Sequence, residues 1–225
     1  MEVNNDNILD PRYYTHQSGL VDPAKLTHRI MIVGAGSVGS WTAMCLGKLG
    51  VRDITVMDMD HVEVHNVGAQ AYTSADEDEP KVEALQRRLS FLLEQPIKGI
   101  NRQWTPEVDL SEYDVVISSV DNITVRKNIY KQLKGSRKLI LDPRMAGNGI
   151  EIYTVRCWEE KDCSFYEDTL FEESETIETP CSERVIAYNV FSIAGMIGNL
   201  LGKYANGQPL PNEVIIDLAN LTMFT

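Results

Sequence analysis

The feature that most constrains this fold is a glycine-rich turn between an apolar run and a helical segment. The letters GAGSVG at 34–39 have the form G-x-G-x-x-G. In such a turn Gly34 permits a tight bend, Gly36 lets a phosphate approach the backbone, and Gly39 allows the helix to pack closely on the strand. The first N–H groups of the helix then face an anion. The turn predicts a nucleotide-binding α/β fold, although a tight turn without a ligand is the alternative.

Apolar runs and helical segments alternate along the rest of the chain. Strands are predicted at 28–36, 53–58, 113–121, 138–145, 149–158 and 213–220, and helices at 37–50, 79–95, 123–135 and 184–203. The second helix is the clearest, because Val82, Leu85, Leu89 and Leu92 recur with helical spacing. This alternation favours a mostly parallel central sheet, covered on both faces and extended by the later strands. We therefore expect a three-layer α/β fold.

Length and composition favour one core. The chain has 225 residues, of which 43% are hydrophobic, and these suit a single large domain. We expect an N-terminal arm at 1–27 and one nucleotide-binding domain at 28–225. Within it, the acidic stretch 159–181 contains one basic residue, Lys161, and is predicted to be a crossover loop.

Charge and cysteine usage exclude several classes of protein. A formal net charge of −12 argues against a nucleic-acid partner. The longest apolar stretch, 185–201, is short and is interrupted by Asn189, Ser192 and Asn199, so a buried helix is favoured over a membrane span. The four cysteines form no C-x-x-C pair, which indicates neither a disulfide framework nor a four-thiolate zinc site. We expect a cytoplasmic protein.

A second polar segment, MDMDHVEVHN at 57–66, follows the strand after the glycine turn. Asp58 lies about twenty residues beyond the turn, where a carboxylate can hold the hydroxyl groups of a ribose. The glycine turn and Asp58 alone are compatible with NAD, FAD or ATP as the bound nucleotide.

The order of the later motifs favours one of these nucleotides and one protein family. After the glycine turn come D-x-D-x-V-x-x-x-N at 58–66, EPKVEAL at 79–85 and SSVDNITVR at 118–126. From about residue 29 to 203, this order resembles the ThiF, MoeB and HesA family, the bacterial relatives of ubiquitin-activating enzymes. The resemblance implies a Rossmann-like domain, normally a homodimer. It also implies ATP-dependent adenylation of a carboxylate, most simply the C-terminus of a small ubiquitin-like or sulfur-carrier protein.

The resemblance also implies roles for single residues. Asp58 would hold the ribose of ATP, Asp60 and Asn66 would belong to the loop around the adenosine and phosphates, and Lys81 would reach the triphosphate. Lys81 as an exposed lysine in the first turn of its helix is the alternative.

Further roles follow from the third motif. Asp121 would hold magnesium or polarise the α-phosphate, and Asn122 and Arg126 would complete the motif. Asp121 can also be an N-cap of the helix that begins at Ile123. Arg144 matches an arginine that the family carries at its following strand.

The chain departs from the family pattern at cationic and thiol positions. Ala69 stands where the family has a phosphate-binding arginine, and His16 stands where the N-terminal arm lends a second one, although Arg12 is near. The cysteine pairs that bind zinc are missing, with Cys163 near the first and Tyr166 where its partner belongs. No zinc site is therefore expected.

Three functions remain open. The first is the adenylating enzyme, and the second is a nucleotide-binding partner subunit without its own activity. The third, an NAD-dependent oxidoreductase, ranks last. Cys181 lies before a predicted helix, which would lower the pKa of its thiol, and some members of the family use a cysteine in this segment for sulfur or acyl transfer. An idle thiol is the alternative.

Overall fold

A computed structural model describes residues 11–93, 96–170 and 185–225. Its strands form one eight-stranded sheet in the order β3-β2-β1-β4-β5-β6-β7-β8. The parallel part consists of β1 (Ile30–Val33), β2 (Ile54–Asp58), β3 (Lys98–Asn101), β4 (Val115–Ser118) and β5 (Leu139–Ala146). The antiparallel extension consists of β6 (Gly149–Arg156), β7 (Glu213–Asp217) and β8 (Thr222–Phe224). The predicted mostly parallel sheet with later strands added is confirmed.

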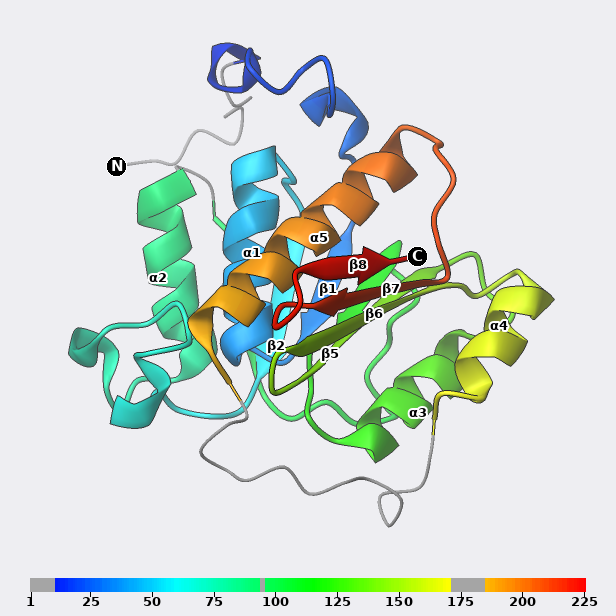
Figure 1. Cartoon of the computed structure of the whole chain (residues 1–225). Coiled ribbons are helices and arrows are strands. Elements are labelled where there is room, and N and C mark those ends of the chain that lie inside the picture. Colours follow the sequence, from blue (N-terminus) through cyan, green and yellow to red (C-terminus); the bar gives the residue numbers. More distant parts are fainter. Residues whose placement is uncertain (1–10, 94–95, 171–184) are drawn as a thin grey trace.

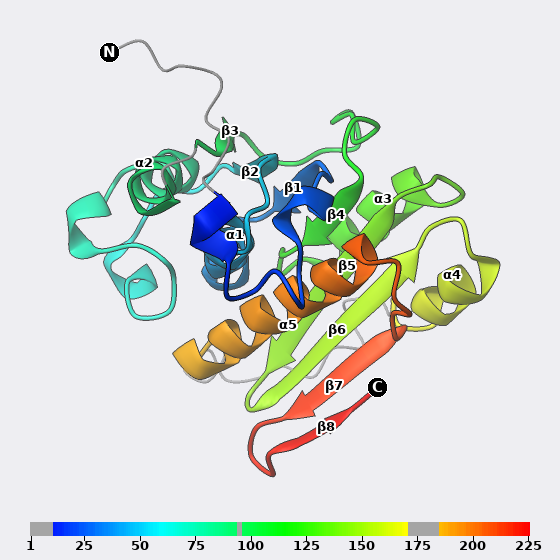
Figure 2. The same ribbon diagram turned by 90° about the horizontal axis from the view of Figure 1, so that it is seen from above.

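Helices cover both faces of this sheet (Figures 1 and 2). On one face lie α1 (Ser37–Leu49), α2 (Lys81–Leu93) and α5 (Ala187–Ala205), and on the other lie α3 (Ile123–Leu133) and α4 (Glu160–Glu167). Each face of the sheet has its own hydrophobic core, and alternate residues of β1 pack into the two cores. Ile30 and Ile32 lie in the first core, and Met31 and Val33 lie in the second. The three layers predicted from the sequence are therefore present.

The strand order places two loops side by side. The chain leaves β1 toward β2 and β3, whereas from β4 it continues toward β5 on the opposite side. The carboxyl ends of β1 and β4 thus border a topological switch point, where open α/β sheets bind their ligands. The glycine turn follows β1 and Ser119 follows β4, and the backbone N–H of Ser119 donates to the oxygen of Val33 at 2.9 Å.

The prediction of a crossover loop from residue 159 is wrong at its start, because residues 160–167 form helix α4. This helix turns Cys163 and Tyr166 into the core. It also buries Asp162 to 3% exposure, and the Asp162 carboxylate pairs with Arg156 at 2.5 Å. The acidic letters had suggested a solvated loop, but one of these acids has a fixed partner on β6. Residues 171–181 lie outside the described residues.

The predicted N-terminal arm packs against the domain from residue 11 onward. It contains two 3-10 helices, η1 (Pro11–Tyr14) and η2 (Pro23–Lys25). The side-chain amide of Gln17 donates to the backbone oxygen of Leu49 at 2.8 Å, and Leu26 is buried in the first core. These residues cover the carboxyl end of α1.

Helix α5 corresponds to the helix predicted at 184–203, which was expected to be buried. A side chain on Gly198 would lie 2.8 Å from Leu49 and 3.1 Å from the sulfur of Cys45, so this glycine lets α1 and α5 approach closely. Gly195, by contrast, has no atom near its missing side chain and faces outward. In the part of the chain that the structure describes, no helix has the length and apolar character needed to cross a membrane.

Candidate functional site

The glycine turn joins β1 to α1 in a conformation that needs glycine at two positions. Gly34 has a φ of +98°, and a side chain there would lie 2.6 Å from the backbone oxygen of Ser119. A side chain on Gly39 would lie 1.9 Å from the backbone oxygen of Gly34. Gly36 is the N-cap of α1, and the space around its α-carbon is open. The first N–H groups of α1 can therefore receive an external anion.

Asp58 ends β2 beside this turn. One carboxylate oxygen accepts the backbone N–H of Ala35 at 2.6 Å, and the other accepts the N–H of Asp60 at 2.8 Å. Each carboxylate oxygen has a second lone pair, so Asp58 can still accept hydrogen bonds from ribose hydroxyls. The structure thus brings together the turn glycines and Asp58, as the sequence predicted.

Lys81 begins α2 and is held against Asp60. Its ammonium group lies 2.9 Å from the Asp60 carboxylate, and its backbone N–H donates to the Asp60 carbonyl at 2.9 Å. The alternative of an exposed first-turn lysine is wrong, because Lys81 is only 7% exposed. The Asp60 side chain is 55% exposed, so the pair is open to solvent on its acidic side.

Asn66 and Ala69 belong to the loop between β2 and α2, which contains two 3-10 helices, η3 (Val64–Asn66) and η4 (Ser74–Asp76). The buried Asn66 side chain accepts the N–H of Glu63 at 3.0 Å, so this amide shapes the loop. The backbone oxygen of Ala69 accepts the indole N–H of Trp41 at 3.1 Å. Helix α1 therefore fixes the backbone at the position where the family has an arginine.

Two further residues contact the glycine turn, and sequence reasoning missed both. The hydroxyl oxygen of Ser119 lies 2.9 Å from the backbone oxygens of Val33 and Gly34, which share its one hydrogen. The hydroxyl of Tyr72 donates to the backbone oxygen of Ala35 at 2.7 Å. The only signal for Tyr72 was its position as the sole Tyr, Phe or Trp between residues 59 and 80.

Asp121 and Asn122 lie between β4 and α3. The side-chain oxygen of Asn122 accepts the N–H of Val125 at 3.0 Å, which makes Asn122 the N-cap of α3. The alternative of Asp121 as the N-cap is therefore wrong. Asp121 is exposed, and it lies two residues after Ser119, which contacts the glycine turn.

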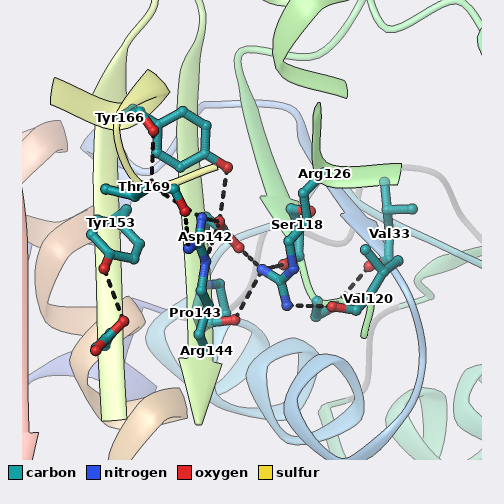
Figure 3. Close-up of polar contacts among 12 residues, drawn as sticks. Val33, Ser118, Val120, Arg126, Asp142, Pro143, Arg144, Tyr153, Tyr166 and Thr169 are labelled. Atoms are coloured by element: carbon teal, nitrogen blue, oxygen red, sulfur yellow. Dashed lines mark hydrogen bonds and ion pairs between the residues drawn. The ribbon is translucent and has the colours of Figure 1, made fainter. Parts of the chain in front are cut away.

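Arg126 does not lie at the surface of this site but is buried between β4 and β5, with 8% exposure (Figure 3). Its guanidinium pairs with the Asp142 carboxylate. It also donates to the backbone oxygens of Ser118 at 3.1 Å, Pro143 at 3.2 Å and Val120. Arg126 therefore ties the carboxyl end of β4 to the middle of β5.

Asp142 is the centre of this network and is fully buried. Its carboxylate accepts hydrogen bonds from Arg144 and from the hydroxyl of Tyr166, each at 2.8 Å (Figure 3). The guanidinium of Arg144 also lies 4.5 Å from the ring centre of Tyr153. Burial lowers the pKa of Arg126 to about 10, so the group stays cationic at neutral pH. Two cations thus share one buried carboxylate in the middle of β5.

The thiols of the described residues are poor nucleophiles. Cys157 and Cys163 are buried, and burial raises the pKa of Cys157 to about 12. Burial also raises the pKa of Cys45. Among the residues that the structure describes, no three His, Cys, Asp or Glu side chains are grouped to hold a metal ion. Cys181 lies outside the described residues.

The chain matches the sequence pattern of the ThiF family over residues 22–224. It is 29% identical to molybdopterin-synthase adenylyltransferase of Escherichia coli K12 over an alignment of 106 residues. This alignment covers 45% of this chain and 43% of that protein. It is 33% identical over 93 residues to ubiquitin-like modifier-activating enzyme 5 of Drosophila virilis, covering 41% of this chain and 20% of that protein. The chain spans less than half of the length of the curated relatives it matches.

The fold also resembles solved structures. The crystal structure of E. coli MccB with ATP superposes with a TM-score of 0.71 at 16% identity, covering 95% of this chain and 68% of that chain. At this level of identity the likeness concerns the fold.

Proposed function

Because the chain belongs to the ThiF family, we propose that it uses ATP to adenylate a carboxylate and releases pyrophosphate. We further propose that the carboxylate is the C-terminus of a small ubiquitin-like or sulfur-carrier protein. Two relatives support these proposals, since one is an adenylyltransferase and the other is a ubiquitin-like modifier-activating enzyme. A cytoplasmic location agrees with this substrate and with the cysteine usage.

One observation carries the proposal: the open N-terminus of α1 lies beside Asp58 at the β1–β4 switch point. A carboxylate that attacks a triphosphate meets like-charge repulsion, so its site must supply positive charge at the phosphates. The N–H groups at Gly36 and the start of α1 supply part of this charge. Asp58 holds the ribose and so sets the distance of the α-phosphorus from the turn.

Lys81, and a magnesium ion that Asp121 would hold, supply the rest of this positive charge. Lys81 reaches the triphosphate by leaving Asp60, whose exposed carboxylate is then hydrated. Asp121 fits magnesium, because this ion usually binds through one or two carboxylates together with phosphate oxygens and water. The ion would neutralise charge on the phosphates. Arg126 is a positioning residue, since it holds the strand ends that carry Ser118 and Val120 rather than facing the ligand.

ATP–pyrophosphate exchange tests the proposal directly. Purified protein, ATP, magnesium and labelled pyrophosphate are combined with each candidate carboxylate protein recovered as a partner. Label should enter ATP only when the true substrate is present. No exchange with any recovered partner, from protein that does bind ATP, would favour the partner-subunit function instead. That alternative is supported by Ala69 and His16, which stand at positions where the family has arginine.

Replacing Asp58 with alanine should weaken ATP binding about tenfold or more, because the carboxylate positions both the ribose and the Ala35 N–H. Isothermal titration calorimetry with ATP and with NAD measures this. The wild-type protein should bind ATP more tightly than NAD. Binding of NAD without binding of ATP would point to the oxidoreductase.

A homodimer is also proposed, and an apolar groove on α5 supports it. The groove has a volume of about 460 Å³ and is bordered by Phe191 and Met196 of α5 and by Met223 of β8. Phe191 is 52% exposed, Met223 57% and the adjacent Phe224 61%. Exposed apolar patches of this kind commonly mark interfaces.

We expect light scattering at micromolar concentration to give roughly twice the 25.3 kDa of one chain. Met223→Asp should shift the protein toward the monomer, because it places a charge in the proposed interface. Phe91→Asp is the matched control, since Phe91 is 85% exposed on α2 outside the groove. A monomeric wild-type protein, or equal effects of both variants, would contradict this interface.

A further inference from the structure

We propose that Tyr72 is a positioning residue that aims the backbone N–H of Gly36 at the phosphates of the nucleotide. The inference rests on the proposed binding of ATP. Tyr72 is 4% exposed, and its hydroxyl donates to the backbone oxygen of Ala35 at 2.7 Å. No contact of Tyr72 with the nucleotide is needed, because the residue acts through the peptide that links Ala35 to Gly36.

The other peptides of the glycine turn are already fixed. The N–H of Gly34 donates to the backbone oxygen of Met57 at 2.8 Å. The backbone oxygen of Gly34 accepts the hydroxyl of Ser119, and the N–H of Ala35 donates to Asp58. The next peptide, from Ala35 to Gly36, has its oxygen held by Tyr72.

The direction of the Gly36 N–H follows from this bond. The described chain contains no cis peptide, and in a trans peptide the C=O and N–H groups point in opposite directions. With its oxygen directed at Tyr72, this peptide must direct the Gly36 N–H away from Tyr72. The space around the α-carbon of Gly36 is open, so a phosphate can approach on that side.

The turn needs this restraint because Ala35 lies between two glycines. Glycine populates positive and negative φ almost equally, so a peptide between such neighbours can rotate at little cost. A rotated peptide would present an oxygen rather than an N–H to the phosphate. The Tyr72 hydroxyl selects one orientation before the ligand arrives.

Tyr72 is itself well held. The N–H of the preceding Ala71 donates to the hydroxyl of Ser40 on α1 at 3.1 Å, and the tyrosine ring packs in the first core. Burial raises the pKa of Tyr72, and the negative charges of Asp58 and Asp76 raise it further. The side chain therefore stays a phenol and a donor at neutral pH.

Tyr72→Phe tests the proposal because it removes the hydroxyl and keeps the ring. We expect the variant to bind ATP roughly threefold to tenfold more weakly, the usual effect of one lost hydrogen bond. Its affinity for adenosine should match that of the wild-type protein, since adenosine has no phosphate. Tyr130→Phe is the matched control, because that buried tyrosine donates to Glu167 at 2.8 Å, between α3 and α4.

Calorimetry with ATP and adenosine on the three proteins separates the outcomes, and thermal melting checks that each is folded. If wild-type protein binds ATP and Tyr72→Phe binds it equally well, the positioning role is wrong while the proposed function stands. Equal losses for ATP and adenosine would also overturn it, because they would indicate general damage to the site. A wild-type protein that binds no ATP would instead remove the proposed function on which the inference rests.

Discussion

Replacing Asp121 with alanine should reduce ATP–pyrophosphate exchange by about a hundredfold or more, the effect of losing one main electrostatic group at a transition state. The chain has Ala69 where the family has an arginine, so fewer cations share the charge of the triphosphate. In the proposed site, Lys81 and a magnesium ion held by Asp121 would then carry more of it.

The structure also predicts that this variant remains folded. Asp121 is exposed and does not cap α3, since Asn122 does. Its removal should therefore change the free energy of unfolding by no more than about 0.5 kcal/mol. Asp121→Asn is an informative companion, because it keeps the shape and removes the charge. Exchange within threefold of wild type in Asp121→Ala would show that the carboxylate has no role in the reaction.

The sequence predicted the parts of the fold that repeat a local pattern. Buried parallel strands such as β1 and β4 appear as short continuous apolar runs, and α1 begins at the glycine turn and ends at Gly50. Asp58 could be placed beside the turn because the spacing of strand, helix and strand is nearly constant in such units. These features depend on residues close together in the chain, so a single sequence is enough to predict them.

Other elements depend on partners far along the chain. Strand β3 has mainly half-exposed or exposed residues, and all three residues of β8 are exposed, so neither shows an apolar run. Helix α4 was missed because its acidic letters conceal the pairing of Asp162 with Arg156. These interactions exist only once the sheet has formed.

The candidate site shows the same division. The spacing of the motifs placed Asp58 beside the glycine turn, whereas the bond from Tyr72 to Ala35 spans 37 residues and has no sequence signature. Arg126 was assigned to the site by its motif, but its guanidinium is used inside the sheet. A motif can therefore identify a residue that belongs to a site without showing which way its side chain points.

Replacing Asp142 with alanine should lower the free energy of unfolding by about 3–5 kcal/mol, the usual effect of removing one partner from a buried ion pair. Asp142 is fully buried and pairs with the guanidinium of Arg126, which is itself 8% exposed. Without the carboxylate, the guanidinium groups of Arg126 and Arg144 lose the anion that both of them contact. Chemical denaturation followed by circular dichroism measures the loss, and we expect a melting temperature lower by roughly ten degrees.

Tyr166→Phe separates the contribution of one hydrogen bond from that of the ion pairs in this network. That variant removes only the hydroxyl that donates to Asp142 at 2.8 Å, and it keeps the ring against Tyr130 and Tyr153. Its cost should be about 1 kcal/mol, because one hydrogen bond is lost and the ion pairs remain. If Asp142→Ala costs no more than Tyr166→Phe, then Asp142 is not the anion that stabilises the buried arginines. In that case the backbone oxygens of Ser118, Val120 and Pro143 would satisfy Arg126, and the link between the carboxyl end of β4 and β5 would not depend on the ion pair.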